Sequence, residues 1–394
     1  MQPKVFEDKK RYRRKLAAKW IAIGVMAAIL ILLALLKLSV EVCEWYSLNI
    51  SANLIKFANI LTGWMPFSLF EILIYLAVAL GVSFLIFIIV ALCMKQFKRA
   101  FNSFVDFALI VVLVGTIYGV FAILPYGRAP ADIPAYENSN LQSEQVYEMT
   151  EGYIEELSRL AKIQKRADNG ELVIEGGLQG LNESLQATYE RVLISDYYYD
   201  TDSTLKKWLW PELMSAFSIS GVFFAPTGEC NVCTAYYTTT TVAAAAHEMA
   251  HSKGVQRESD ANLVSYYIML NSEDNLVKYV GYYTLVGNML AFVHTWCGEG
   301  AYDSLWDKLP EEYFADAEFA AAYSSGQGAL GSVGSFFNDI YLQLNGTEDG
   351  TGDYHPSDET ITEEVPDGDG GTQIVTRIEY SDVNKMLLYM FYSE

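Results

Sequence analysis

The sequence predicts a mostly helical membrane protein in which three transmembrane helices precede a domain of helices with a small sheet. Three observations support this fold class: three long apolar stretches in the first 126 residues, a reversal of net charge after them, and helical spacing of apolar residues in the remainder. We therefore expect a membrane domain over residues 1–126 and a second domain over residues 127–394.

The apolar stretches are each long enough to cross a hydrocarbon core of about 30 Å. The first contains an uncharged run, Trp20–Leu36, which is longer than the apolar core of a cleaved signal peptide and has no small-residue cleavage site after it. The predicted spans cover about residues 18–40, 70–94 and 105–126.

The charges predict how the chain crosses the membrane. Met1–Pro125 has 13 Lys/Arg against 6 Asp/Glu, whereas the rest has 14 against 42, a net charge of −28. Eight basic residues precede the first span and three lie between the second and third, but the loop between the first and second offers only Lys56. The positive-inside rule places the N-terminus in the cytoplasm and everything after Tyr126 outside. We expect a multi-pass cell-membrane protein in contact with the lipid bilayer, with an extracytoplasmic domain whose charge excludes nucleic acid as a partner.

The second domain contains several segments with helical periodicity and one segment rich in β-branched and aromatic residues. The latter, Ser218–Tyr237, is interrupted by Pro226 and Gly228 and predicts a strand or hairpin. The acidic segment Asn345–Gln373 predicts a loop or hairpin, and its Asp367 and Asp369 indicate a solvated turn more than a calcium site. The predicted helices are Asn140–Ala167, Ala243–Lys253, Glu258–Leu270, Asp274–Val293, Glu311–Ala322, Gly331–Leu344 and Ser381–Tyr392.

The motif HEMAH at residues 247–251 uses two of the chain's four histidines. Residues four apart share one face of a helix, so His247 and His251 can direct their imidazoles at the same ion. Glu248 is rotated off that line and can hold a water molecule as a general base. The spacing therefore indicates a catalytic zinc site, against the alternative of an ordinary histidine pair on a helix.

A zinc finger is a second interpretation of the same segment. Cys230, Cys233, His247 and His251 have the spacing C-x2-C-x13-H-x3-H. The surrounding domain is acidic, however, and the segment between the two pairs lacks the basic residues of a nucleic-acid finger. The finger also assigns no role to Glu248. In the extracytoplasmic compartment, two of Cys230, Cys233 and Cys297 could instead form a disulfide.

A catalytic zinc site needs a third protein ligand. Gly254 matches the glycine of the motif H-E-x-x-H-x-x-G-x-x-H, but Arg257 stands where its third histidine would be, and Glu258 follows. The segment ESDAN, residues 258–262, resembles the third-ligand helix of glutamate-type zincins. That resemblance implies that Glu258 is the third ligand and that Asn262 supports a motif histidine. Asp260 is the alternative third ligand.

Nearly the whole chain resembles a family of bacterial membrane proteins, domain of unknown function 3810. The resemblance is carried by the three spans and by the segments SGVFFAPTGECNV, HEMAHSKGVQRESDANLVSYY and FFNDIYLQLNG. It implies a zincin-like fold for the second domain and a metallopeptidase activity with zinc as the cofactor. Cys230 and Cys233 depart from the small or polar residues expected at their positions.

The predicted function is hydrolysis of peptide bonds in a peptide or protein substrate outside the cytoplasm, with Glu248 as general base. His294, Tyr341 and Tyr380 are candidates for the donor that stabilises the oxyanion, and the strand Gly221–Phe224 is a candidate platform for substrate backbone. Two alternatives stay open, a zinc-containing sensor without turnover and a different metal-dependent hydrolase such as a cell-wall amidase. The residues predict neither the substrate nor the oligomeric state.

Overall fold

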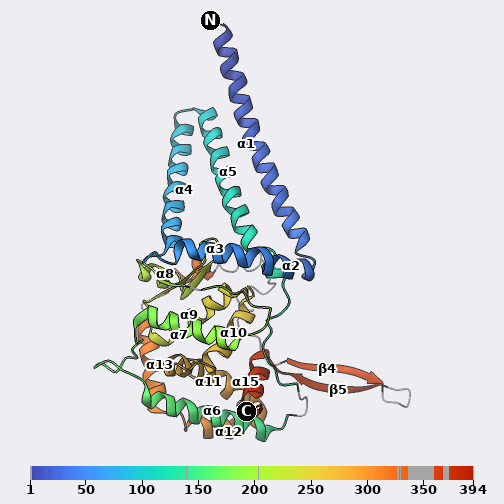
Figure 1. Ribbon diagram of the computed structural model, residues 1–394, viewed down its shortest axis with the longest axis vertical. Coiled ribbons are helices and arrows are strands. Elements are labelled where there is room, and N and C mark those ends of the chain that lie inside the picture. Colours follow the sequence, from blue (N-terminus) through green and yellow to red (C-terminus); the bar gives the residue numbers. More distant parts are fainter. Residues whose placement is uncertain are drawn as a thin grey trace. The chain divides into compact units, whose positions relative to one another are not determined.

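The computed structural model describes residues 2–137, 141–202, 204–325, 328, 330–335, 359–366 and 372–393. The chain divides into two compact units (Figure 1). The N-terminal unit comprises Met1–Ala129 together with Tyr199–Thr204 and Phe224–Glu229. The C-terminal unit comprises Pro130–Tyr198, Leu205–Phe223 and Cys230–Glu394.

Three long apolar helices dominate the N-terminal unit: α1 (Gln2–Leu36), α4 (Leu69–Cys93) and α5 (Phe97–Ala122). Helices α1 and α4 both contact α5, and each of the three is long and apolar enough to cross a membrane. The expectation of three such helices is therefore confirmed, and it agrees with a membrane protein. Two of the helices differ from the predicted spans at both ends: α1 begins at Gln2 and ends at Leu36, and α5 begins at Phe97 and ends at Ala122. Hydropathy alone does not include the polar turns at the start of these two helices.

Between α1 and α4 the chain forms α2 (Val40–Tyr46), a π-helical turn η1 (Ser47–Ser51) and α3 (Ala52–Thr62), none of which was predicted. Ser39 caps the start of α2, where its hydroxyl accepts a hydrogen bond from the Val42 amide. The apolar runs in this segment are too short to cross a membrane. For this reason the sequence indicated only a loop between the first two spans.

Two short segments from later in the chain complete the N-terminal unit. The Asn59 side chain donates to the Gly228 carbonyl at 3.0 Å, and the Thr62 hydroxyl donates to the Thr227 carbonyl at 2.8 Å. The buried Glu229 carboxylate accepts the amides of Leu69 and Phe70, so it satisfies the free N–H groups in the first turn of α4. A single predicted boundary between residues 126 and 127 could not include these segments.

The C-terminal unit is built mainly from helices packed around α11 (Asn275–Cys297), which contacts α6 (Ser143–Ile163), α9 (Thr238–Ser252), α10 (Glu258–Leu270) and α12 (Glu299–Trp306). The remaining helices are α7 (Gly177–Val192), α8 (Pro211–Ala216), α13 (Glu311–Ser324) and α15 (Asp382–Tyr392), and η2 (Pro125–Gly127) is a 3-10 turn of the N-terminal unit. One core unites most helices of the C-terminal unit, and its fully buried members include Leu157, Leu185, Tyr279 and Phe292.

Helix α11 is also long and apolar enough to cross a membrane by length and composition. Its most apolar stretch, however, is 56% buried inside the protein, whereas that of α1 is 0% buried and that of α4 is 6% buried. A helix that is apolar all round is expected in the centre of a helical core as well as in a bilayer. We therefore assign α11 to the core of the C-terminal unit.

The sheet is small, as expected. Strands β1 (Thr204–Lys207), β2 (Gly221–Phe224) and β3 (Glu229–Val232) form a three-stranded sheet in the order β1-β3-β2, so β2 is an edge strand. A separate antiparallel hairpin pairs β4 (Glu359–Pro366) with β5 (Thr372–Glu379). Asp367, Asp369 and most of the predicted helix Gly331–Leu344 lie outside the described residues. All five cysteines are free thiols.

A buried carboxylate connects four segments of the C-terminal unit: helices α11 and α13, the residue before α9 and the loop after α6. Asp316 of α13 is fully buried and accepts two hydrogen bonds of 2.8 Å from the Arg166 guanidinium. It also accepts the hydroxyls of Tyr237 at 2.7 Å and Tyr279 at 2.5 Å. Tyr237 directly precedes α9, so this network fixes the start of the helix that carries the HEMAH motif.

We predict that Asp316→Ala strongly destabilises the protein. The change leaves a guanidinium and two buried hydroxyls without their shared acceptor, and breaking a buried pair in this way costs about 3–5 kcal/mol. Glu318→Ala on the exposed side of the same helix is the matched control and should change stability by less than about 0.5 kcal/mol. Denaturant unfolding of the detergent-solubilised protein measures both, and equal midpoints for the two variants would contradict the assignment.

Candidate metal centre

The HEMAH motif lies in the second half of α9, within the core. The alanine run Ala243–Ala246 favours a helix, and its small side chains let neighbouring helices approach closely. Ala245, Ala246 and Ala250 are fully buried. The Tyr189 hydroxyl of α7 donates to the Ala246 carbonyl at 2.6 Å, one residue before His247. Packing and this hydrogen bond hold the motif helix in a fixed position.

A tight turn brings α10 back against α9. Gly254 has φ +91°, a left-handed conformation that strongly favours glycine. Its amide bonds the His251 carbonyl, and the Val255 amide bonds the Ala250 carbonyl, which together form the Schellman ending of a helix. Because of this turn α10 begins at Glu258, only seven residues after His251.

The turn places three candidate ligand atoms together. His247 Nε2 lies 3.0 Å from Glu258 Oε2 and 3.1 Å from His251 Nε2. The third pair, His251 Nε2 and Glu258 Oε2, lies 3.4 Å apart. Among the residues that the structure describes, this is the group of three whose ligand atoms are close enough to hold a metal ion.

The spacing of these atoms fits a tetrahedrally coordinated ion. For metal–ligand bonds of about 2.0–2.1 Å, neighbouring ligand atoms of a tetrahedron lie about 3.3–3.4 Å apart. The three observed separations of 3.0, 3.1 and 3.4 Å are close to that value. Two imidazoles and one carboxylate also form a donor set that leaves a fourth tetrahedral position free for another ligand.

Hydrogen bonds orient both imidazoles toward this centre. His247 Nδ1 lies 2.9 Å from Asn262 Oδ1, and His251 Nδ1 lies 2.7 Å from the Val255 carbonyl. Both partners are acceptors, so each Nδ1 carries a proton and each Nε2 faces the centre, where the neutral imidazole presents its lone pair to a metal ion. Such outer partners fix the tautomer and the orientation of metal-binding histidines. The structure thus gives Asn262 the supporting position that the resemblance implied.

The electrostatics of Glu258 and His251 are those of a cation site. Burial alone would raise the pKa of Glu258, but the charge and hydrogen bonds of the two imidazoles lower this pKa well below its ordinary range. Burial opposes the charged form of His251, yet the Glu258 carboxylate raises the His251 pKa to about 9. The cluster therefore attracts positive charge, which protons supply when no metal ion is bound.

Glu248 lies beside the triad on α9 and contacts the edge strand β2. Its carboxylate accepts the Phe223 amide, and burial raises its pKa above the ordinary value. A Cβ atom on Gly221 would lie 2.5 Å from Glu248 Oε1, so only glycine lets the strand approach this closely. The Cys230 thiol donates to the Glu248 backbone carbonyl at 3.3 Å. A buried carboxyl with a raised pKa is suited to moving protons near neutral pH.

The alternative ligands face other partners. Asp260 Oδ2 accepts the Ala131 amide at 3.2 Å and Arg257 Nε at 3.0 Å. The Cys233 thiol donates to the Pro211 carbonyl at 3.1 Å, and the Cys230 thiol donates to Glu248 as described above. The four-residue arrangement of a zinc finger is thus not formed, and the structure favours Glu258 over Asp260 as the third ligand.

The predicted oxyanion donors are not brought to the triad by the contacts that the structure describes. His294 lies edge-on to Tyr302, with ring centroids 5.7 Å apart. Tyr380 packs against Phe292 and Trp296 in the core. Tyr341 lies outside the described residues. The role of these three side chains therefore stays a prediction without support from the site's geometry.

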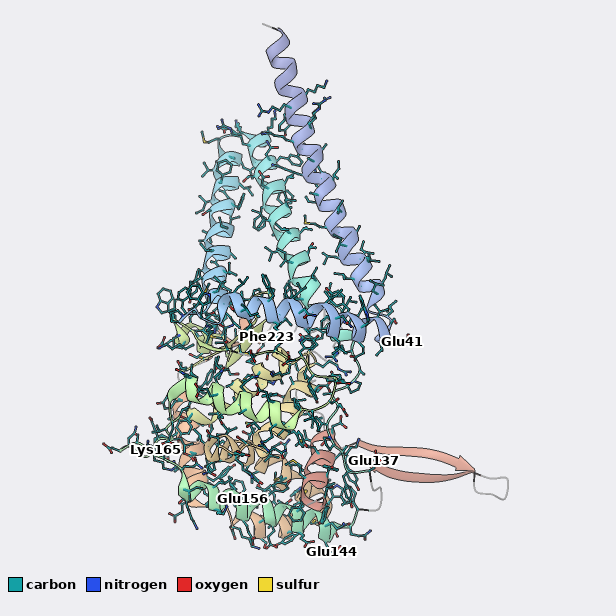
Figure 2. All side chains as sticks on the ribbon, in the orientation of Figure 1. Glu41, Glu137, Glu144, Glu156, Lys165 and Phe223 are labelled. Atoms are coloured by element: carbon teal, nitrogen blue, oxygen red, sulfur yellow. The ribbon has the colours of Figure 1, made fainter. Side chains whose placement is uncertain are left out.

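The contact between β2 and Glu248 was not predicted. The sequence indicated Gly221–Phe224 only as a platform for substrate, because a strand has no local signal for the helix that it contacts. A glycine opening a strand was the one available signal, since it often marks a close approach of another group. In Figure 2, Phe223 labels the position of this strand among the side chains.

Comparison with known proteins gives one match. The sequence model of the family described as protein of unknown function (DUF3810) matches residues 46–357, most of the chain, and includes the triad and Glu248. Neither the curated proteins nor the solved structures include a match to this chain. The match bears out the family noted in the sequence over a shorter range, since it leaves out α1 and the residues after 357, and the chain belongs to the DUF3810 family.

Proposed function

We propose that this protein is a membrane-anchored zinc metallopeptidase whose C-terminal unit hydrolyses peptide bonds outside the cytoplasm. The observation that carries the proposal is the convergence of His247, His251 and Glu258 beside the buried Glu248. Two histidines, one carboxylate and an open fourth position match the ligand set of catalytic zinc sites, whereas structural zinc sites are filled by four protein ligands.

The three ligands would hold the zinc ion, which when bound acts as a Lewis acid toward water and the scissile carbonyl. Glu248 would take the proton from the attacking water and pass it to the leaving amine, because its carboxyl is buried and its pKa is raised. Asn262 and the Val255 carbonyl keep the imidazoles in the tautomer that binds metal. The edge strand β2 offers backbone groups to an extended peptide.

The same proposal includes the cellular location. The basic residues at the N-terminus and between α4 and α5 support a cytoplasmic position for these ends of the helices. The acidic C-terminal unit then lies outside, anchored in the cell membrane by α1, α4 and α5. Its partners are the lipid bilayer and a peptide or protein substrate.

The first prediction from the proposed function concerns metal content. The purified full-length protein should contain about one zinc ion per chain, and Glu258→Ala should lose it because one of three protein ligands is removed. Asp260→Ala and the double variant Cys230→Ser with Cys233→Ser should keep it. Elemental analysis of the variants measures this. Zinc loss in the cysteine variant with retention in Glu258→Ala would favour a finger instead.

The second prediction concerns catalysis. Glu248→Gln should keep the zinc ion but lower cleavage of a fluorogenic peptide library by about 10²–10⁴-fold, the usual effect of removing a general base. Unchanged peptide cleavage by this variant would contradict the mechanism. If the wild type cleaves cell-wall fragments but no peptide, the protein is an amidase. If it binds zinc and cleaves neither, it is a sensor.

Gly221→Ala extends the same experiment to the strand. The new methyl group must displace the Glu248 carboxylate, since it would lie 2.5 Å from Oε1. We expect retained zinc and strongly reduced turnover. Gly287→Ala is the control, because a Cβ atom there meets nothing within 4 Å; a loss of activity in both variants would mean that the effect is not local.

The third prediction concerns topology. Ile194 is 88% exposed in the C-terminal unit and Lys10 is exposed near the N-terminus. In a background with Cys93 and Cys297 replaced by serine, a membrane-impermeant maleimide should label Ile194→Cys in intact spheroplasts. It should label Lys10→Cys only after lysis. The reverse pattern would place the C-terminal unit in the cytoplasm.

A further inference from the structure

The segment α2–η1–α3, residues 40–62, forms a run of helical turns between the apolar helices α1 and α4. Figure 1 shows it lying across the ends of α1, α4 and α5 within the N-terminal unit. Only residues 37–39 separate it from α1, and only residues 63–68 separate it from α4. Six extended residues reach at most about 20 Å, so the segment cannot move far from the ends of these helices.

One face of this segment packs against its own unit, and two of its three charged residues, Glu44 and Lys56, pair with residues of that unit, whereas Glu41 is exposed. Ile55, Ala58, Asn59 and Thr62 are buried, and the last two make the hydrogen bonds to Gly228 and Thr227. Glu44 of α2 pairs with Arg128 at 2.8 Å, and Lys56 of α3 pairs with Asp200 at 2.9 Å.

The opposite face is apolar and aromatic. Five large side chains of this face and of the turn after α3 are more than half exposed: Trp45 60%, Phe57 60%, Ile60 67%, Leu61 52% and, in the turn, Trp64 76%; Val40 at the start of α2 is 52% exposed as well. Two asparagines share this face, and each returns its amide to the helix backbone, Asn49 to the Trp45 carbonyl and Asn53 to the Asn49 carbonyl. We call the five large side chains the outer stripe.

This distribution is the reverse of that on a water-exposed helix, where apolar residues face the protein and charges face solvent. A continuous apolar stripe of this kind marks a surface that contacts a partner or a membrane. Both of its ends lead directly into helices that are long and apolar enough to span a bilayer. Tryptophan near each end of the stripe is typical of the boundary between acyl chains and headgroups.

We propose that the outer stripe lies in the surface of the bilayer, with the α2–η1–α3 segment parallel to the membrane plane. The occupant of the stripe is the boundary between the acyl chains and headgroups of the leaflet at which α1 ends and α4 begins. The proposal depends on α1 and α4 crossing the membrane and is independent of whether the His247 site is catalytic. It makes the segment an interfacial helix that fixes the depth of the N-terminal unit.

Fluorescence quenching tests this placement in the full-length protein reconstituted in phosphatidylcholine liposomes. Subtracting the emission of Trp64→Phe from that of the wild type isolates the signal of Trp64. We expect strong quenching of this signal by lipids brominated near the headgroup and weak quenching by aqueous acrylamide. Trp306, 40% exposed in the C-terminal unit, is the matched control, and its signal, isolated with Trp306→Phe, should respond in the opposite way.

Three results would overturn the proposal. Acrylamide quenching of Trp64 as strong as that of Trp306 would mean that the stripe faces water. Stronger quenching by bromine at the chain ends than near the headgroups would mean that the segment is embedded and not interfacial. Protection from both quenchers would mean that a protein, such as a second copy of the chain, covers the stripe.

A charge substitution gives an independent measurement. Ile60→Glu should shift the thermal unfolding midpoint of the liposome-reconstituted protein downward, because it places a carboxylate in the acyl boundary. Ile194→Glu, at an 88% exposed position of the C-terminal unit, should cause no such shift. A shift for Ile60→Glu no larger than that for Ile194→Glu would contradict the lipid contact.

Discussion

The candidate site depends on one constraint, the burial of a carboxylate between two imidazoles. Glu258, His247 and His251 have side chains only 7%, 15% and 10% exposed, and burying such groups is costly unless they are paired or bound to a metal. The Schellman turn at Gly254 makes the pairing available locally, since it joins both helices within a few residues. The unit around the triad then has to hold α9 and α10 rigidly, which α7, α11 and the Asp316 network do.

Much of the secondary structure follows from short-range patterns, and for that reason it could be predicted. The periodicity of Glu258–Leu270 matched α10 at both ends. Helix α9 begins at Thr238, five residues before the predicted start, because four β-branched threonines weaken the helical signal while packing overrides their propensity. The segment α2–η1–α3 was missed for a different reason, since its apolar runs are too short to indicate a span and the residues between the first two spans were therefore interpreted as a loop.

The features that could not be predicted are those that join residues distant in sequence. Asn59 bonds Gly228 across 169 residues, and Glu229 caps α4 across about 160. No local pattern contains such pairs, because side chains of these types satisfy their hydrogen bonds in many ways. The residue types of the site were predictable, as metal ligands need particular donors at particular spacings. The contacts of His294 and Tyr380 with aromatic neighbours could not be predicted, because any histidine or tyrosine side chain can serve as a hydrogen-bond donor as far as its residue type shows.

The contact between β2 and Glu248 combines a local sequence signal, a glycine at the start of a strand, with a contact between residues that are distant in sequence. β2 is an edge strand of the described sheet, so its backbone groups on the side away from β3 pair with no other described strand. One of them, the Phe223 amide, bonds the Glu248 carboxylate, and Gly221 leaves room for that carboxylate. An edge is normally a liability, but here the strand orients the group whose proton transfer the proposed mechanism requires. The strand is therefore part of the site itself, in addition to any contact it makes with a substrate, and this explains why a glycine stands at its first position.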